Sequence, residues 1–372
     1  MLIGVLGGGQ LGMMLAQAGK PLGHTFRFLD PSPESPASSE GEFVQGDYSD
    51  TRTLETFGRG LDLVTWEFEN VPSSAVQVLS RRLPCFPGIA LLEIAQDRLS
   101  EKTAFREIGL APARHVPISS RADLQDGVGA IGLPCVLKTR RMGYDGKGQF
   151  VLRGRDDVEA AWCELGRAGQ LVLEEFLEFE FETSLIACRG KGGGIVFYPM
   201  PMNTHKGGIL RLSRVGAGAE IEPELEHQAR AAMAKLMDGM DYVGVLTFEF
   251  FVVRRGEGRA IIANEMAPRV HNSGHWTIEG ARTSQFANHC LAITKAELGS
   301  TALLEPAAAM INIVGEQPDP SAVKSIPGAT LHLYGKQPRP GRKLGHMTVT
   351  GTAESVDRAI ALSRGLPGVM LD

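Results

Sequence analysis

Short apolar runs alternate with a helical pattern along the first hundred residues of the chain. Residues 2–6, 26–30 and 61–66 are apolar runs bounded by glycine, proline or acidic residues, which predicts strands. Apolar positions between 11 and 19 recur at helical spacing, which predicts a helix after the first strand. Strands and helices in alternation form a parallel sheet with helices on both faces. We therefore expect a doubly wound, Rossmann-like α/β domain over residues 1–100.

The rest of the chain has a different pattern in each of two sections. Helices are expected at 98–109 and 224–239, strands at 135–138, 171–176, 245–253 and 260–265, and a glycine-rich loop at 140–149. This mixture lacks strict alternation and predicts an α+β domain over residues 101–300. From about residue 307 the strands are short, with Gly- and Pro-rich turns such as 336–341, and a last helix is expected at 353–364. We expect a small β-rich domain over residues 301–372.

Composition narrows the class of protein. The chain has 372 residues and a formal net charge of -5, so it lacks the basic surface that nucleic acid requires. Its apolar runs are far shorter than a membrane span, and the glycine-broken start lacks the basic residues of a signal peptide. The five cysteines form no C-x-x-C pair, which argues against a disulfide framework or a zinc site. We expect a soluble, cytoplasmic protein.

A glycine cluster follows the first predicted strand. The run Gly7-Gly8-Gly9-Gln10-Leu11-Gly12 satisfies G-x-G-x-x-G, and Asp30 ends the next strand. A tight turn at a helix N-terminus presents backbone N–H groups to any phosphate. Three interpretations therefore stay open at this motif: a nicotinamide dinucleotide site, a site for another phosphate, and a turn with no ligand.

A lysine and a cationic loop form the second candidate site. Lys138 closes an apolar strand, and the loop at 140–149 carries Arg140, Arg141 and Lys147 among its glycines. A lysine beside such a loop suits a triphosphate, because the ammonium supplies charge and the loop can exclude water. Glu174, Glu175 and Glu182 follow, and their carboxylates could bind an adenine amine and ribose hydroxyls. The alternatives are a solvated hairpin loop and a charged surface run.

Two acids in apolar strands form the third candidate site. Glu249 lies within the run 245–253, and Glu265 follows Asn264 in the next strand. A carboxylate in so apolar a strand is costly unless it is paired or bound to a metal. If the strands are neighbours, the two carboxylates meet and suit magnesium held together with phosphates. The alternative is two unrelated acids, each in its own salt bridge.

Two further clusters of polar residues lie toward the C-terminus. Arg269, His271, Asn272 and His275 fall within nine residues directly after the second acidic strand. Such density beside a proposed metal is more typical of a site than of a turn. A second group of basic residues comprises Lys336, Arg339, Arg342, Lys343 and His346. This group suits a clamp on a substrate phosphate, and the alternative is a solvated basic turn.

Taken in order, these motifs resemble those of the 5-(carboxyamino)imidazole ribonucleotide synthase family, a branch of the ATP-grasp enzymes. The resemblance rests on residues 7–12, Ala95-Gln96-Asp97-Arg98, 143–149, 264–275 and Gly341-Arg342-Lys343-Leu344-Gly345-His346, and it spans nearly the whole chain. The runs 264–275 and 342–346 are specific to that family, whereas the lysine, the loop and the paired acids are common to ATP-grasp enzymes. Met142 and Phe176 depart from the family pattern, since many members carry glycine at the first position and some carry a small residue at the second.

The resemblance implies a three-part ATP-grasp fold, a homodimer, and binding of ATP and magnesium. The residues that it places at ATP are Arg98, Lys138, Gly143, Tyr144, Asp145, Gly146, Lys147, Gly148, Gln149, Glu174, Glu175, Phe176, Leu177, Glu182, His205, Asn264 and Glu265. It places magnesium on Glu249 and Glu265. The residues that it directs to the ribonucleotide are Gly8, Gly9, Gln10, Leu11, Arg269, His271, Asn272, Lys336 and Arg342. A catalytic role falls to Arg269, His271 and Lys343.

The chemistry that the resemblance implies uses only small-molecule substrates. ATP phosphorylates bicarbonate to carboxyphosphate, which breaks down to carbon dioxide and phosphate beside the amine of aminoimidazole ribonucleotide. No covalent nucleophile is needed, so positioning and charge neutralisation would carry the reaction. The competing hypotheses are an ATP-grasp enzyme with another acceptor, using formate or biotin, a nicotinamide dehydrogenase, and a silent nucleotide-binding module. The dehydrogenase leaves Glu249 and Glu265 unexplained.

Overall fold

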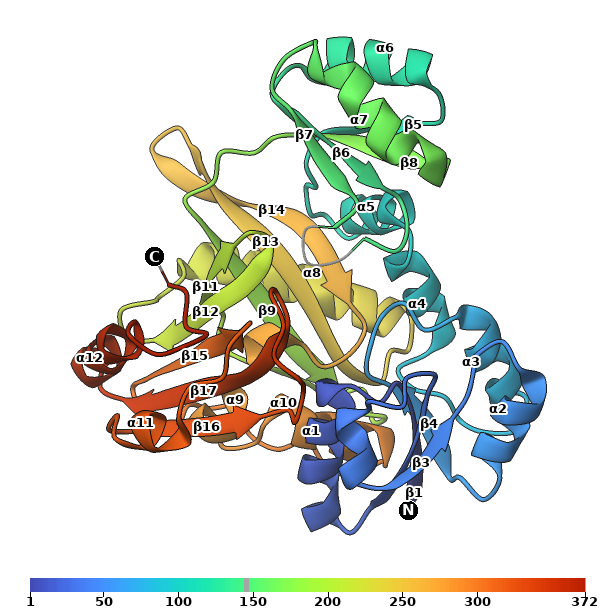
Figure 1. The fold of residues 1–372 in the computed structure, drawn as a ribbon, viewed down its shortest axis with the longest axis vertical. Coiled ribbons are helices and arrows are strands. Elements are labelled where there is room, and N and C mark those ends of the chain that lie inside the picture. Colours follow the sequence, from blue (N-terminus) through green and yellow to red (C-terminus); the bar gives the residue numbers. More distant parts are fainter. Residues whose placement is uncertain (144–146, 372) are drawn as a thin grey trace.

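The computed structural model describes residues 1–143 and 147–371, which form three sheets (Figure 1). Tyr144, Asp145 and Gly146, which the resemblance directs to ATP, lie outside the described residues. None of the helices in the described part of the chain is long and apolar enough to cross a membrane.

The N-terminal section is the parallel sheet that the alternating pattern predicts. Its strands are β1 (Leu2–Leu6), β2 (Thr25–Asp30), β3 (Glu42–Gln45) and β4 (Leu63–Trp66), in the order β3-β2-β1-β4. The helices around it are α1 (Gln10–Gly19), α2 (Thr51–Gly58) and α3 (Ser73–Ser80), and short 3-10 turns cover Lys20–Leu22 and Pro36–Ser39. The prediction of a doubly wound α/β domain is confirmed.

A small antiparallel sheet stands at the top of the molecule in Figure 1, away from the other two. Its strands are β5 (His115–Ile118), β8 (Leu171–Glu175), β6 (Cys135–Thr139) and β7 (Gln149–Leu152), in that order. Helices α6 (Arg121–Ile131) and α7 (Asp157–Leu165) pack against it, and a 3-10 turn covers Gly166–Ala168. The chain enters this sheet through α4 (Ile89–Ala95) and α5 (Arg98–Glu107). Helix α5 is therefore one of two connections between this sheet and the rest of the protein, and residues 176–180 between β8 and β9 form the other.

The largest sheet has nine strands and joins the central and C-terminal sections. Its order is β14-β13-β9-β11-β12-β15-β17-β16, with β10 beside β9. The bounds are β9 (Phe181–Arg189), β10 (Ile195–Phe197), β11 (Met202–Lys206), β12 (Ile209–Gly216), β13 (Gly244–Arg255), β14 (Gly258–Ala267), β15 (Ala307–Val314), β16 (Ala329–Leu333) and β17 (Lys343–Gly351). Since β12 pairs with β15, the predicted domain boundary at 300/301 falls inside one continuous sheet. That boundary stays a prediction.

Helices cover this sheet at several places. The longest is α8 (Pro223–Gly239), whose buried residues share a core with β9 and β13. The others are α9 (Thr277–Gly280), α10 (Gln285–Ile293), α11 (Pro320–Lys324) and α12 (Ala353–Ser363), with a 3-10 turn at Asn272–Gly274. Helix α12 packs its buried face on β15 and β17, as expected for the last helical pattern.

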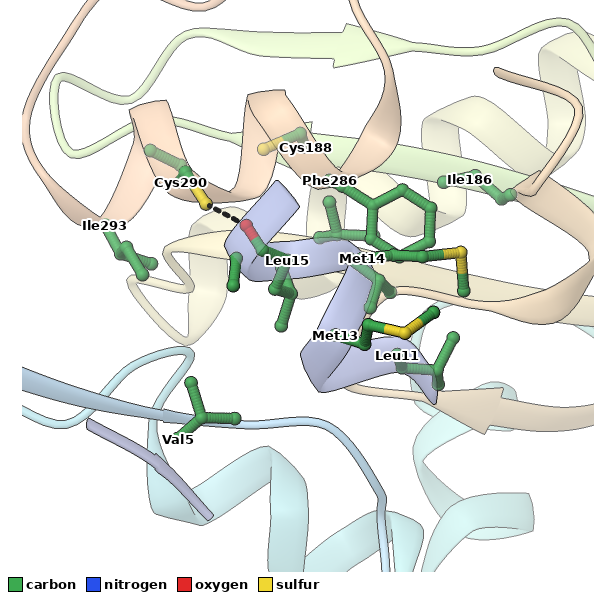
Figure 2. Packing of buried hydrophobic residues seen from close by; sticks show 14 of the residues in the cluster. Val5, Leu11, Met13, Met14, Leu15, Ile186, Cys188, Phe286, Cys290 and Ile293 are labelled. Carbon is green, nitrogen blue, oxygen red and sulfur yellow. Dashed lines mark hydrogen bonds between the residues drawn. The ribbon is translucent and has the colours of Figure 1, made fainter. Parts of the chain in front are cut away.

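The N-terminal sheet is fixed to the large sheet by one apolar core. Figure 2 shows α1 beside α10, with Met14, Leu15 and Phe286 among the packed side chains. The Cys290 thiol donates a hydrogen bond to the Leu15 carbonyl at 3.6 Å. Close packing of this kind resists relative movement. The start of α1, which follows the glycine cluster, is therefore held against the large sheet.

Candidate active site

A cavity of about 820 Å³ lies where the three sheets meet. The N-terminal sheet contributes residues that follow β1 and β4, the small sheet contributes β6, β7 and β8, and the large sheet contributes β13 and β14. Most of the site residues expected from the sequence line this cavity. They are Gln10, Leu11, Arg98, Lys138, Gly143, Lys147, Gln149, Glu174, Glu175, Phe176, Leu177, Glu182, His205, Glu249, Asn264, Glu265, Arg269, His271, Asn272 and Lys343. Segments far apart in sequence thus form one site.

Lys138 faces the cavity from β6 and is held by a carboxylate. Its ammonium donates to Glu174 Oε2 at 2.9 Å, and the other oxygen of Glu174 lies 3.1 Å from the ammonium of Lys102. Burial alone would raise the pKa of Glu174, but the charges of Lys138 and Lys102 outweigh it and lower that pKa well below its usual range. Glu174 is therefore ionised, with both oxygens engaged by lysines. Its predicted contact with adenine stays a prediction.

The cavity has a group of apolar side chains around the end of β8. The side chains there are Ala113, Val136, Val151, Phe176, Leu177, Phe179 and Phe251. The Glu175 carboxylate is turned aside, because it accepts hydrogen bonds from the backbone N–H and Nε of Arg114 at 2.8 and 2.7 Å. An adenine ring in this slot would be recognised by apolar contact and by backbone groups of residues 175–177 rather than by Glu175.

Met142 precedes the part of the loop that lies outside the described residues. Its φ is 65°, in the left-handed region that favours glycine, and its side chain is 70% exposed. This explains the glycine that the family pattern carries at that position.

The two acids meet as predicted. Glu249 and Glu265 are directly opposite residues on β13 and β14, and a β-bulge follows Glu249. Burial and the charge of Glu265 raise the pKa of Glu249 to about 8. Two neighbouring carboxylates repel each other, and a divalent cation bound by both would offset that repulsion. Arg98 Nη1 lies 3.8 Å from Glu265 Oε2, so a guanidinium is near the same point.

His271 is neutral and oriented by its neighbours. Burial, followed by the charges of Arg269 and Lys343, lowers its pKa well below the usual range. Nδ1 accepts from the backbone N–H of Ser273 at 3.3 Å and lies 2.8 Å from the Ser273 hydroxyl. The proton is therefore on Nε2, which lies 3.1 Å from Glu249 Oε1. His271 thus orients a proposed metal carboxylate.

A second histidine of the cavity contacts an acid. His205 Nδ1 is 3.0 Å from Glu182 Oε1 on the neighbouring strand. Burial lowers the pKa of His205, but the hydrogen bond and charge of Glu182 outweigh burial and raise it. Both residues line the cavity beside Asn264, as the resemblance requires.

The region expected at the ribonucleotide holds a cation and an unsatisfied amide. Arg269 Nε donates to Glu69 Oε2 at 2.5 Å, and Nη1 donates to the Val270 carbonyl. Both polar side-chain atoms of Asn272 are buried and have no hydrogen-bond partner among the described residues. Buried polar groups need partners, so a polar ligand beside Asn272 fits. Lys343 lines the same end of the cavity.

Glu69 was not expected from the sequence, although it lines the cavity. A signal was present, because Glu67 and Glu69 follow β4, and ligands in parallel sheets bind beyond the carboxyl ends of the strands. The buried Glu101 and Lys102 on α5 were also not expected, since a charged helix pattern is typical of a solvated face.

The glycine cluster is occupied by the protein itself. Gly8 N–H donates to Asp30 Oδ2 at 2.8 Å, and Gly9 N–H donates to Glu67 Oε1 at 2.8 Å. The other Glu67 oxygen accepts from Leu11 and Gly12, each at 3.1 Å. A Cβ at Gly9 would lie 2.4 Å from Glu67 Oε1, so the glycine admits this carboxylate. Of the three interpretations, the geometry favours the turn with no phosphate on these N–H groups.

Some expected site residues that the structure describes do not line the cavity. They are Gly8, Gly9, Gly148, Lys336 and Arg342. Lys336 lies at its edge, because its ammonium donates to Gln10 Oε1 at 2.5 Å. Arg342 Nη2 lies 3.6 Å from Glu34 Oε2, and Nη1 donates to the Gln337 carbonyl. The two basic residues thus have partners within the protein.

Comparison with known proteins agrees with this arrangement. Residues 103–286 match the ATP-grasp domain, 1–96 match the ribonucleotide synthetase preATP-grasp domain, and 308–359 match the phosphoribosylaminoimidazole carboxylase C-terminal domain. The chain is 47% identical over 364 residues to the N5-carboxyaminoimidazole ribonucleotide synthase of Pseudomonas aeruginosa, covering 98% of this chain and 97% of that protein.

Solved structures give the same result. N5-carboxyaminoimidazole ribonucleotide synthetase from Thermus thermophilus superimposes with a TM-score of 0.93 at 48% identity, covering 100% of this chain and 99% of that one. The Aspergillus clavatus enzyme, in complex with ADP and 5-aminoimidazole ribonucleotide, superimposes with a TM-score of 0.86 at 29% identity, covering 98% and 96%. The chain therefore belongs to the N5-carboxyaminoimidazole ribonucleotide synthase family of ATP-grasp ligases.

Proposed function

We propose that the protein carboxylates 5-aminoimidazole ribonucleotide in purine biosynthesis, using ATP and bicarbonate and releasing ADP and phosphate. The observation that carries this proposal is the shared cavity. One wall presents Lys138, another presents the opposed Glu249 and Glu265, and the third presents Arg269, Asn272 and Lys343. A triphosphate, a divalent cation and a phosphorylated amine each have a matching group of residues.

Magnesium fits the paired acids. Glu249 and Glu265 repel each other without a cation, and Arg98 beside them can contact the same phosphate oxygens. Magnesium held there would neutralise charge on the transferred phosphoryl group. His271 keeps Glu249 oriented through the Nε2 contact, which is the way that metal ligands are commonly fixed.

The chain's own residues serve the reaction by holding and enclosing the substrates. Lys138 and Arg98 bind the phosphates, while a bicarbonate oxygen takes the γ-phosphoryl group and ADP leaves. The carboxyphosphate then breaks its C–O bond to give carbon dioxide and phosphate. The amine nitrogen forms the new N–C bond, and its proton goes to the released phosphate, which is a base. Enclosure matters because water would hydrolyse the carboxyphosphate.

The assembly and location are also proposed. We expect a homodimer in the cytoplasm, on the basis of the family resemblance and the composition. The partners are the small substrates, with no role for nucleic acid or membrane.

An ADP-release assay tests the substrate assignment. Full turnover should require both bicarbonate and 5-aminoimidazole ribonucleotide, with formate and glycinamide ribonucleotide as control acceptors. Faster ADP release with either control would replace the substrate assignment. NADH binding measured by fluorescence should be absent, because Asp30 and Glu67 fill the glycine cluster.

A further inference from the structure

Lys102 is a buried ammonium that lies behind the nucleotide wall of the cavity. Its side chain is 1% exposed, and its Nζ lies 3.1 Å from Glu174 Oε1. Lys138 and Glu174 line the cavity, and Lys102 is not part of that lining in the described residues. A buried ammonium is costly unless it is paired. The mechanism above gives Lys102 no role, so its burial needs an explanation.

Glu174 is shared between two lysines. One oxygen faces Lys102, and the other accepts from Lys138 at 2.9 Å. These three groups together carry one net positive charge. Without Lys102, Glu174 and Lys138 would form a neutral pair, and the wall that faces the phosphates would lose that charge.

Helix α5 fixes Lys102 in this place. At its start, Asp97 caps the helix by accepting from the Leu99 N–H at 3.0 Å and pairs at 2.7 Å with Arg140, which directly follows β6. Glu101, next to Lys102, contacts the opposite wall, where its Oε1 accepts from the Met266 N–H at 2.6 Å. The helix is thus anchored to both walls, which fixes the backbone from which the Lys102 side chain reaches Glu174.

We propose that Lys102 is a positioning residue for ATP, which holds one oxygen of Glu174 so that Lys138 presents a net positive charge to the phosphates. The proposal rests on the proposed function in one respect, since it takes this wall to be the ATP site. Lys102 itself touches no substrate. Its effect reaches ATP through Glu174 and Lys138, so ATP binding should respond and ribonucleotide binding should not.

The first test replaces Lys102 by methionine, which keeps much of the length and removes the charge. The dissociation constant for ATP with magnesium is measured by calorimetry without the other substrates, and the KM of the ribonucleotide is measured separately. We expect Lys102→Met to weaken ATP roughly tenfold to a hundredfold and to leave the ribonucleotide KM within about twofold. The control is Lys235→Met, because Lys235 is exposed and donates to the Glu107 carbonyl at the other end of the same helix. Unchanged ATP affinity in folded Lys102→Met would overturn the proposal.

The second test is a double-mutant cycle with Glu174→Gln, which remains informative if Lys102→Met does not fold. With the carboxylate gone, Lys102 and Lys138 no longer share an acid, so Lys102 can no longer act on ATP through Glu174. Adding Lys102→Met to Glu174→Gln should therefore cost less than roughly threefold in ATP affinity. A tenfold loss in that background would mean that Lys102 acts independently of Glu174, and the proposal would be wrong. Because calorimetry needs no turnover, a failed carboxylation assay would count against the proposed function alone.

Discussion

Glu249 on β13 lies directly opposite Glu265 on β14, at the only point in that hairpin where the described register shifts. Directly opposite residues share one face of a sheet, so both carboxylates line the cavity. His271 contacts the first acid and Arg98 lies near the second.

Glu249→Gln and Glu265→Gln should each nearly abolish turnover. Each substitution removes one negative charge from the proposed magnesium site, and a loss of ~3 kcal/mol of transition-state stabilisation slows a reaction roughly a hundredfold. The measurement is ADP release at saturating substrates over a range of magnesium concentrations.

The unfolding temperature of the same variants provides a second test, with a matched control. Without magnesium, each variant should unfold at a temperature no lower than the parent protein, because the substitution removes repulsion between neighbouring carboxylates. Glu257→Gln is the control, since Glu257 is exposed in the turn of the same hairpin. Near-normal turnover in either site variant would show that magnesium is held elsewhere.

Arg342→Ala should weaken the ribonucleotide and leave ATP almost unchanged. A guanidinium binds phosphate through two N–H groups, so its loss should cost about 1.4 to 3 kcal/mol, or one to two orders of magnitude in KM. Arg342→Lys should recover part of that loss. Paired Michaelis curves for the two substrates provide the measurement.

Glu34→Gln is the control for this experiment. It removes the carboxylate that lies 3.6 Å from Arg342 but keeps the guanidinium. We expect ribonucleotide binding as good as in the parent protein or better. If Arg342→Ala instead raises the KM of ATP, or changes neither KM, the basic turn has no role at the ribonucleotide.

Lys336 should make kcat/KM for the ribonucleotide fall at alkaline pH. Burial, together with nearby Arg342 and Lys343, lowers its pKa to about 8, although the charge of Glu67 opposes the shift. The ammonium that would attract a phosphate is therefore lost as the pH rises through about 8. At saturating ATP, kcat/KM for the ribonucleotide should fall above that pH, and Lys336→Arg should move the fall to higher pH. Identical pH profiles for the two proteins would exclude Lys336 as the source of the fall in kcat/KM.

His346 should make stability depend on pH. It is buried beside Tyr334, whose hydroxyl lies 2.8 Å from Nδ1, and burial followed by the charges of His275 and His332 lowers its pKa well below 6.5. A histidine whose pKa is lower in the folded state binds its proton more readily when unfolded. Its contribution to stability is therefore full above about pH 6.5 and is lost as the pH falls below it.

The difference in unfolding free energy between the parent protein and His346→Asn should therefore shrink below pH 6.5. The limit for one histidine is about 1.4 kcal/mol per pH unit. Denaturant unfolding at several pH values between 5 and 7.5 measures it. His227→Asn, at an exposed position of α8, is the control for the loss of an imidazole at the surface. A constant difference for His346→Asn would mean that its proton does not respond to folding.

Local pattern by itself predicted part of the order of elements and many residues of the candidate site. The apolar run around Glu249 and the run that ends at Glu265 predicted both a pair of strands and the cost of two acids within them. The strand that ends at Lys138 and the dense run 267–275 were predicted in the same way. These features can be read from the sequence because side-chain periodicity and desolvation act over a few residues.

Only the tertiary structure decided which charges are paired. Glu67 occupies the N–H groups of a glycine cluster that is 55 to 58 residues away in the chain, and Arg269 pairs with Glu69 over 200 residues. Likewise, Lys102 on a charged helix is buried and lies 3.1 Å from Glu174, which belongs to β8 of the small sheet. An ion pair depends on a distance of a few ångströms between side chains, and a local pattern does not specify that distance. Chain packing therefore decided that the glycine cluster is a turn filled by a carboxylate and that a second lysine contacts the same carboxylate as Lys138.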